Sequence, residues 1–220
     1  VVSIARLIAK DELEVADIVA SLDRAGLLTR DGDVIRFAQT LVCASVLVRL
    51  PPSRRDAMHV RAAHVLYEID APREQIAAQV LASHDSAHHW TCSVLSDAAR
   101  EAVRRGAYDV ARAYLLRGLQ ECAGQRQVKL LRTLGQIELS TDPATAAAYL
   151  RRALVLSPDR EERTGIQIDL AHCLYLLDKP QEAGGVLAKG IAEEGPSPQD
   201  VLVLRGEQFV LGGISQAGEG

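Results

Sequence analysis

Apolar residues at helical spacing run through most of this chain, and one short segment near the N-terminus departs from that pattern. They recur at intervals of three and four from Val15 to Leu22, which predicts a helix that ends at Gly26. Two short apolar runs follow on either side of the turn Asp31-Gly32 and predict a β-hairpin. A helix, a hairpin and a further helix in this order are typical of a small winged-helix module, with the hairpin as its wing.

From Thr40 onward the pattern is almost wholly helical. The next helices are predicted over 41–49, 53–69, 75–83 and 89–105, and prolines mark the breaks between the first three. Proline ends a helix because it lacks the backbone N–H group and because its ring obstructs the preceding turn. The chain therefore alternates between helices and short connections along most of its length.

A set of small and large apolar residues occurs three times beyond residue 107. Each copy has a small residue, a leucine four positions later and a second small residue three positions after the leucine. The members are Ala111, Leu115 and Gly118, then Ala146, Leu150 and Ala153, and then Ala183, Leu187 and Gly190. A period of about 34–37 residues with two helices per unit is typical of tetratricopeptide-like solenoids. In such arrays small residues let facing helices approach closely, and units stack because one pair alone cannot bury its apolar face.

These patterns predict an all-α fold class with one small β-hairpin, in which a winged helix precedes a tetratricopeptide-like α-solenoid. Val201–Leu211 is expected to form the first helix of a fourth unit. The predicted parts are a winged-helix-like module with its following helices at 1–70, connecting helices at 71–106, degenerate repeats at 107–211 and a flexible tail at 212–220.

Composition and charge narrow the class of protein. The chain has 220 residues, 48% of them hydrophobic, which is enough for a sizeable core and excludes a disordered chain. Its formal net charge of −4 argues against broad nucleic-acid binding. The longest apolar stretch, 41–48, is much shorter than the roughly 20 residues of a membrane span. We therefore expect a cytoplasmic protein without membrane contact. Because it begins with Val rather than Met, we expect a piece of a longer chain.

Cysteine spacing gives no sign of a metal or redox site. Cys43, Cys92, Cys122 and Cys173 are too far apart in sequence for the short motifs of zinc or disulfide-exchange sites. Each lies in a helical pattern among apolar neighbours. We therefore expect four buried free thiols, which a reducing cytosol would maintain.

Five short stretches between residues 25 and 67 follow a characteristic order. They are Ala25-Gly26-Leu27-Leu28, Ile35-Arg36-Phe37, Leu41-Val42, Leu50-Pro51-Pro52-Ser53-Arg54-Arg55 and His59-Val60-Arg61-Ala62-Ala63. In this order they resemble the segment after the ATPase core in large LuxR-type transcription regulators, a bacterial branch of the STAND signalling ATPases. The resemblance implies an upstream ATPase domain that binds ATP or ADP and a downstream DNA-binding domain. It implies no cofactor within this chain.

The same resemblance implies one nucleotide-facing position, Gln39. Family members carry a histidine there, within Phe-x-His-Pro-Leu-Val, and this histidine approaches the nucleotide phosphates. The corresponding stretch here reads Phe37-Ala38-Gln39-Thr40-Leu41-Val42. A neutral amide can donate a hydrogen bond to phosphate but supplies no charge, so the departure weakens nucleotide sensing at this position.

Basic residues supply a second candidate site. Arg54, Arg55 and Arg61 lie on one predicted helix, the helix over 53–69. They form either a solvated face or a contact with another domain or with a nucleotide phosphate. By contrast, acidic residues outnumber Arg24 on the helix before the hairpin, so we expect no direct binding of nucleic acid by the winged helix.

A histidine cluster offers two candidate metal ligands. His84 and His88 are four residues apart, as two ligands on one helix face would be, with Asp85, His89 and Cys92 nearby. No third ligand is placed well, so surface or capping roles are expected and no metal. The tyrosines lie mostly at repeat spacing and are expected to fill the core or, in part, to line a groove.

The sequence contains no motif of covalent or phosphate chemistry. It lacks Gly-x-x-x-x-Gly-Lys-Ser/Thr, Gly-x-Ser-x-Gly and His-Glu-x-x-His. We therefore expect no catalytic residue. The resemblance implies a regulatory fragment that relays nucleotide state and binds a small-molecule or protein inducer. Two other interpretations stay open, namely a stand-alone tetratricopeptide-like scaffold for protein partners and the accessory domain of an enzyme.

Overall fold

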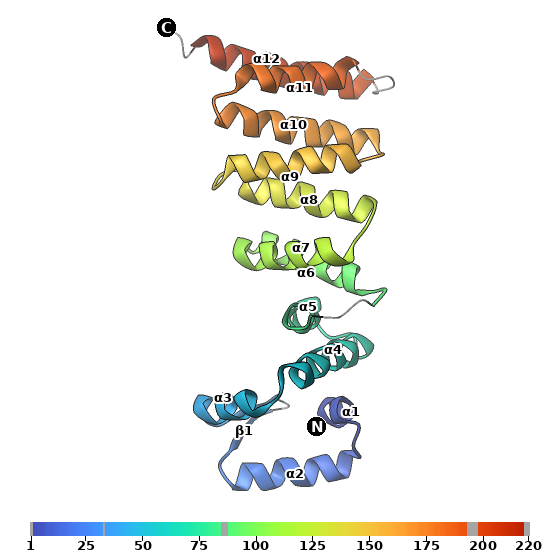
Figure 1. Cartoon of the computed structure of the whole chain (residues 1–220), viewed down its shortest axis with the longest axis vertical. Helices are drawn as coiled ribbons and strands as arrows, with labels where there is room; N and C mark the ends of the chain where they lie inside the picture. Colours follow the sequence, from blue (N-terminus) through green and yellow to red (C-terminus); the bar gives the residue numbers. More distant parts are fainter. Residues whose placement is uncertain (1, 33, 85–87, 193–197, 218–220) are drawn as a thin grey trace. The chain divides into compact units, whose positions relative to one another are not determined.

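The computed structural model describes residues 2–32, 34–84, 88–192 and 198–217. Twelve helices and one two-stranded antiparallel hairpin occupy these residues, which confirms the predicted all-α class with a small hairpin. Figure 1 labels these elements and colours the chain from its N-terminus to its C-terminus. The chain divides into two compact units, Val1–Val94 and Leu95–Gly220. Within the described residues, no helix combines the length and apolar character that a membrane span requires.

The first unit contains five complete helices and the hairpin. The helices are α1 (Val2–Ile8), α2 (Glu12–Arg24), α3 (Thr40–Arg49), α4 (Pro52–Glu68) and α5 (Arg73–Ala82). Strands β1 (Leu28–Asp31) and β2 (Val34–Phe37) pair in antiparallel register, with Leu28 opposite Phe37. Helix α1 packs against both α2 and α4, and α4 packs against α5.

Local chemistry explains where α2 begins and the chain reverses. The Asp11 carboxylate accepts a hydrogen bond from the Leu13 backbone N–H at 2.9 Å, so it caps the first turn of α2. After α2, Gly26 has a φ of +70°, a left-handed conformation that glycine adopts without a steric penalty. Gly32, in the hairpin turn, has a φ of +57° for the same reason.

The core around the hairpin is small. It consists of the buried residues Ala5, Val15 and Val19, with a few half-buried aliphatic side chains packed against them. Helix α3 contributes nothing to it, because no residue of α3 is buried. The side chains of Leu41 and Val48 on this helix are 76% and 82% exposed. Residues 40–49 therefore form an apolar helix whose surface this chain leaves open.

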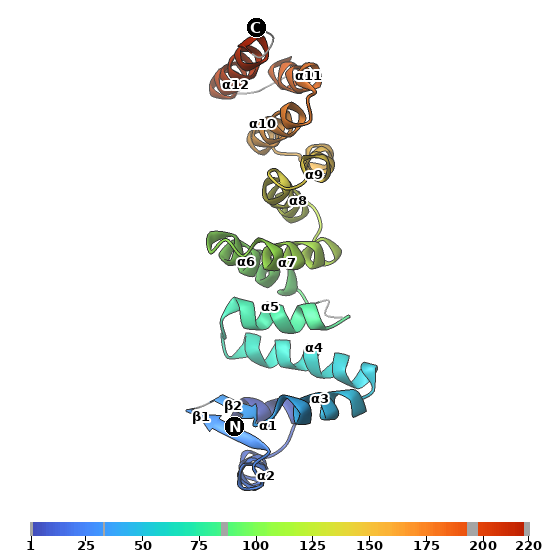
Figure 2. The same ribbon diagram turned by 90° about the vertical axis from the view of Figure 1, so that its left-hand side faces the viewer.

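The second unit is a succession of helices, and from α7 onward each packs against the next. Helix α6 (Thr91–Arg104) ends within it. The others are α7 (Tyr108–Glu121), α8 (Gln125–Glu138), α9 (Pro143–Leu156), α10 (Arg160–Leu176), α11 (Pro180–Ala192) and α12 (Pro198–Ala217). Successive helices from α7 to α12 contact one another, and Figure 2 shows the same order from a second side.

The repeated small and large residues lie inside this unit. All members of the three sets on α7, α9 and α11 are buried, as the spacing predicts. A Cβ atom at Gly118 would lie 2.9 Å from a methyl carbon of Leu130, and one at Gly190 would overlap the Gln167 amide. Gly135 on α8 is equally confined, because its Cβ would lie 2.6 Å from Cγ of Leu150. Small residues at these positions therefore permit the close approach of neighbouring helices.

A side chain from α10 also fixes the connection between α9 and α10. The Arg163 guanidinium donates hydrogen bonds to the carbonyl oxygens of Leu154 at 2.8 Å and Ser157 at 3.4 Å. These carbonyls belong to the end of α9, where the helix leaves acceptors without an internal partner and where a positive charge is favourable.

One expectation about the chain is corrected. Cys92 and Cys122 are each disulfide-bonded, so the prediction of four free thiols is wrong for these two residues, whereas Cys43 and Cys173 are free. Cys43 is half-buried rather than buried. Helix α12 continues to Ala217, so it includes residues 212–217 of the expected tail. Residues 218–220 of the expected flexible tail lie outside the described residues.

Candidate functional site

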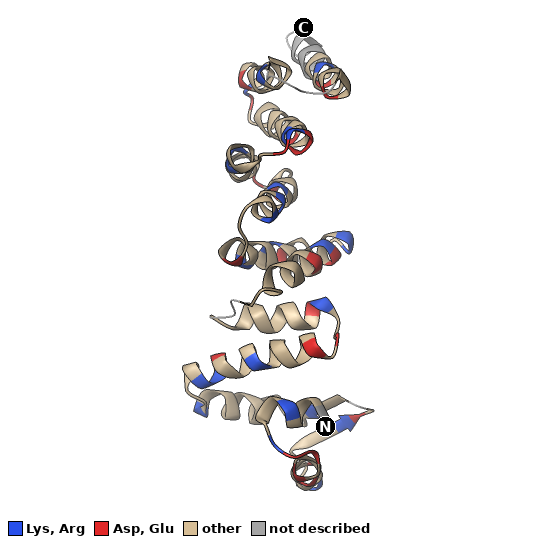
Figure 3. Cartoon of the chain, turned by 90° about the vertical axis from the view of Figure 1, so that its right-hand side faces the viewer, with Lys and Arg blue, Asp and Glu red and all other residues tan. Residues whose placement is uncertain are grey.

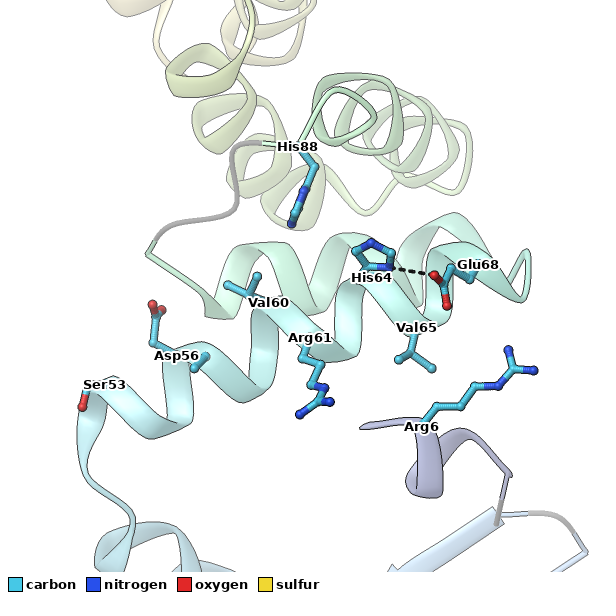
Figure 4. A pocket seen from close by; sticks show the side chains of 10 residues that line it. Arg6, Ser53, Asp56, Val60, Arg61, His64, Val65, Glu68 and His88 are labelled. Atoms are coloured by element: carbon cyan, nitrogen blue, oxygen red, sulfur yellow. Dashed lines mark ion pairs between the residues drawn. The ribbon is translucent and has the colours of Figure 1, made fainter. Parts of the chain in front are cut away.

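An open cleft of about 720 Å³ lies between α1 and α4 in the first unit. Figure 4 shows the side chains that line it. Helix α1 contributes Arg6, and α4 contributes a face on which Arg61, His64 and Glu68 recur at intervals of three and four residues. His88, which follows α5, completes the lining. Residues at this spacing share one side of a helix, so the regular α4 segment gathers these charged groups along the cleft.

Both carboxylates of the cleft already have histidine partners. The Asp56 carboxylate accepts a hydrogen bond from the His84 backbone N–H, and its Oδ1 atom lies 3.1 Å from Nδ1 of His84. The backbone hydrogen bond is the main cause that lowers the pKa of Asp56, and the His84 side chain adds to it. Glu68 Oε1 lies 3.3 Å from Nδ1 of His64, one helical turn away, and Figure 4 marks this pair.

The two arginines of the cleft have no such partners. Among the described residues, neither Arg6 nor Arg61 forms an ion pair, although both guanidinium groups carry a permanent charge. The formal charges of the two acids and the two arginines cancel, but only the acids have polar partners among the described residues. Both guanidinium groups therefore keep hydrogen-bond donors for a carboxylate or another acceptor.

A smaller groove of about 280 Å³ adjoins the cleft and shares Ala57 and Arg61 with it. Leu7 and Ile8 of α1 and Met58 of α4 give it an apolar lining. Its other polar residue, Arg54, lies two turns before Arg61 on α4 and also has no ion pair within the described part of the chain. The groove contains no acidic side chain, so its charge is wholly positive.

The three arginines predicted from sequence as a candidate site do not all line the same cavity. Arg54 and Arg61 line one groove, seven residues apart on α4, whereas Arg55 lines neither cavity. The Nε atom of Arg55 is buried and has no hydrogen-bond partner. Arg6 joins the site from α1, and sequence reasoning missed it because nothing local links it to a helix that begins at Pro52. Their role in binding a partner stays a prediction.

Gln39 lies at the N-terminal cap position of α3. Its backbone is extended, with a φ of −133°, and its side chain makes no capping hydrogen bond. It is exposed, beside the open apolar surface of α3. The amide is therefore free to contact a ligand or a neighbouring domain, and its role toward nucleotide stays a prediction.

An aromatic stack adjoins the cleft through His88. The His88 ring stacks on Trp90 with centroids 5.1 Å apart, and Trp90 stacks on Tyr67 at 4.5 Å. His64 meets His88 edge to face at 5.6 Å. Trp90 is the only tryptophan of the chain and is buried. Because His88 touches both the cleft and the indole, tryptophan fluorescence can report on events in the cleft.

Two of the candidate metal ligands in the histidine cluster are engaged in other interactions. Cys92 is disulfide-bonded and His84 is engaged with Asp56, while Asp85 lies outside the described residues. Among the residues that the structure does describe, no group of three or more histidine, cysteine or acidic side chains is arranged to hold a metal ion.

A polar network crosses alternate helices of the second unit. Asp169 of α10 accepts hydrogen bonds from Arg132 Nε at 2.8 Å and from Gln136 Nε2 at 2.9 Å, both on α8. Further along, Nε2 of His172 lies 3.0 Å from Oε2 of Glu207 on α12. Figure 3 colours the positions of the basic and acidic residues on the ribbon of these helices. These contacts link α8 to α10 and α10 to α12 through polar groups.

Comparison with known proteins leaves the family open. No family model matches the chain, and no curated protein matches it. The LuxR-type resemblance of residues 25–67 and the repeat character of the second unit are therefore carried by the residues themselves, and both enter the account below as proposals.

Proposed function

We propose that this chain is a non-catalytic regulatory segment of a LuxR-type, ATP-dependent transcription regulator in the cytoplasm. Residues 1–70 form a winged-helix-like module with its following helices, which docks on an upstream ATPase domain and relays its ATP or ADP state. The second unit is a tetratricopeptide-like solenoid that binds an inducer or a protein partner. A downstream domain of the same parent chain binds DNA, and no residue of this segment performs covalent chemistry.

The open apolar surface of α3 is the observation that carries this proposal. Helix α3 has ten residues, none buried, and Leu41 and Val48 are almost fully exposed. Contiguous exposed apolar surface marks an interaction site, because water contact with such a surface is unfavourable. The helix directly follows the hairpin, within the stretch that resembles the segment after an ATPase core. A neighbouring domain that covers α3 would thereby be coupled to the winged-helix module.

The packing of the second unit supports the other half of the proposal. The three sets of small and large residues are buried on every second helix, α7, α9 and α11. Paired helices with such positions, stacked side by side, are the construction of tetratricopeptide-like arrays. These arrays present the first helices of their units to a ligand, which here would be α8, α10 and α12 with their polar network.

The parent gene offers the most direct test. The proposal expects a Gly-x-x-x-x-Gly-Lys-Ser/Thr motif in the coding sequence upstream and a helix-turn-helix downstream. In the full-length parent, Leu41→Glu with Val48→Glu should abolish signal-dependent transcription without unfolding the protein. Val155→Glu, at an equally exposed valine of α9, is the matched control. An upstream sequence without a phosphate-binding motif would reject the regulator.

The polar network favours a second candidate, a stand-alone scaffold that binds a protein segment. Arg132, Asp169 and His172 lie on alternate helices and offer both charges to a partner. In this alternative the winged helix is only a cap. Flanking sequence that encodes neither an ATPase nor a DNA-binding domain would favour the scaffold over the regulator.

A further inference from the structure

We propose that the cleft between α1 and α4 binds a free amphiphilic carboxylate, an organic anion with an apolar body. The site comprises the cleft lined by Arg6 and Arg61 and the adjoining groove lined by Leu7, Ile8, Arg54 and Met58. This inference goes beyond the regulatory role proposed above and does not depend on it, because it rests only on residues of the first unit.

Charge selects the sign of the ligand. The acids Asp56 and Glu68 face histidines, whereas Arg6 and Arg61 have no ion pair among the described residues. The charges of Asp56 and Glu68 remain in the cleft, so the preference for an anion rests on the adjoining groove, where Arg54 and Arg61 meet no acidic side chain. Arginine and carboxylate form two parallel charge-assisted hydrogen bonds, whereas an amine carries the same charge as the guanidinium groups and is repelled.

The adjoining groove selects the rest of the ligand. Leu7, Ile8 and Met58 supply apolar surface, and the side chains of Ile8 and Met58 are 40% and 37% exposed. Covering this surface with an alkyl chain removes it from water, which is favourable in proportion to the area covered. A ligand with a charged head alone would leave the groove empty.

Arg61 places the two parts of the ligand relative to each other. It is the charged residue that lines both the cleft and the groove, so the acid group belongs at Arg61 and the apolar chain extends from there along α1. Arg54 marks the far end of the groove, two turns of α4 away, or about 10 Å. The cleft volume of about 720 Å³ lies within the range of roughly 300–1,000 Å³ typical of small-molecule sites.

The experiment uses decanoate, below its micellar concentration, as the probe for the whole chain. Trp90 fluorescence is followed, because His88 lines the cleft and stacks on this single indole. Titration calorimetry supplies the dissociation constant. Decanoate should bind saturably with one equivalent per chain, and decylamine, which has the same tail but the opposite charge, should not bind.

Variants test the assigned cations. Arg61→Gln should weaken decanoate binding by about tenfold or more, since it removes a charge-assisted hydrogen-bond donor. Arg6→Gln should weaken it by a smaller factor. Arg126→Gln, at an exposed arginine of α8 with no ion pair among the described residues, should leave the affinity unchanged. Circular dichroism and the melting temperature confirm that each variant is folded.

Several results would overturn the proposal. Equal binding of decanoate and decylamine would mean that the apolar groove acts without the arginines. An unchanged affinity in the folded Arg61→Gln variant would remove the assigned head-group position. Binding only to phosphatidylglycerol vesicles would indicate a membrane surface instead, and binding only to an octa-glutamate peptide would indicate an acidic polypeptide.

Discussion

The two units treat their apolar side chains in opposite ways. Around the hairpin, three buried residues form the core and α3 keeps its leucines and valines at the surface. In the second unit a continuous cluster runs from Val128 on α8 to Leu204 on α12, through members of every intervening helix. Both regions have apolar helices, so composition does not separate them. The difference lies in whether a facing helix packs on the apolar side chains, and among the described residues none buries a residue of α3.

Truncation of one buried leucine in the second unit should give the largest change in the free energy of unfolding. Leu150→Ala deletes a side chain that is 1% exposed and should lower the free energy of unfolding by about 2–5 kcal/mol. Leu41→Ala, at a leucine that is 76% exposed, should change it by about 0.5 kcal/mol or less. Urea denaturation followed by circular dichroism measures both values. Equal costs would mean that α3 is packed after all.

Glycine-to-alanine substitutions should also differ between a confined and an open position, with a smaller change in the free energy of unfolding. Gly135→Ala forces a Cβ to within 2.6 Å of Leu150 and should destabilise the second unit by about 1–3 kcal/mol. Gly185→Ala, in α11 with open space around it, should stabilise by about 0.5–1 kcal/mol, because alanine loses less backbone entropy in a helix. Thermal melts of the two variants compare them directly. Destabilisation by both would show that the confined contact is not the cause.

The two free thiols, one in each unit, should differ in their rates of alkylation. Burial, with a contribution from the nearby Asp169 charge, raises the pKa of Cys173 to about 11. At pH 8 roughly one Cys173 side chain in a thousand is a thiolate, so alkylation by iodoacetamide should be very slow. Half-buried Cys43 in the first unit should react faster. Mass spectrometry of the alkylated peptides reports both rates, and faster labelling at Cys173 would contradict its placement in the core.

The raised pKa of Cys173 also determines how the stability of the folded protein changes with pH. The folded protein holds the Cys173 proton more tightly than the unfolded chain does, so this group adds stability below its unfolded pKa of about 8.5. That contribution is lost as the pH rises from there toward about 11. Cys173→Ser should reduce the dependence of unfolding on pH in this range. If the free energy of unfolding of Cys173→Ser depended on pH as the wild-type value does, groups other than Cys173 would cause the loss of stability at alkaline pH.

The smallest effect is expected at a helix cap. Asp142 accepts a hydrogen bond from the Thr145 backbone N–H at 3.1 Å, and its hydrogen bonds to Thr145 lower its pKa. The cap is therefore fully effective above the unfolded pKa of aspartate, about 3.9, and is lost as the pH falls through the lower folded pKa. Asp142→Ala should lower the melting temperature at pH 7 and make little difference near pH 2. Equal losses at both pH values would contradict the capping role.

Sequence periodicity predicts the parts of this fold that depend on local repetition. The three sets on α7, α9 and α11 recur at a fixed spacing, and their burial follows because a helix has one inward face. The hairpin follows from Asp31-Gly32, since glycine accepts the left-handed turn. Such features need only nearby residues, and they are the ones that the sequence analysis predicted correctly.

The cleft depends on contacts between distant segments, and sequence reasoning reached only half of it. Arg54 and Arg61 lie on one helix and could be grouped by spacing, but Arg6 belongs to a helix about fifty residues earlier. The hydrogen bond between Asp56 and His84 likewise joins α4 to a residue that follows α5.

The Arg163 contact makes the joint between α9 and α10 depend on a polar side chain as well as on apolar packing. One guanidinium on α10 donates hydrogen bonds to closing carbonyls of α9, which have no partner within their own helix. A substitution at Arg163 therefore removes a hydrogen-bonded link at this joint without changing any of the buried leucines and small residues of the two helices.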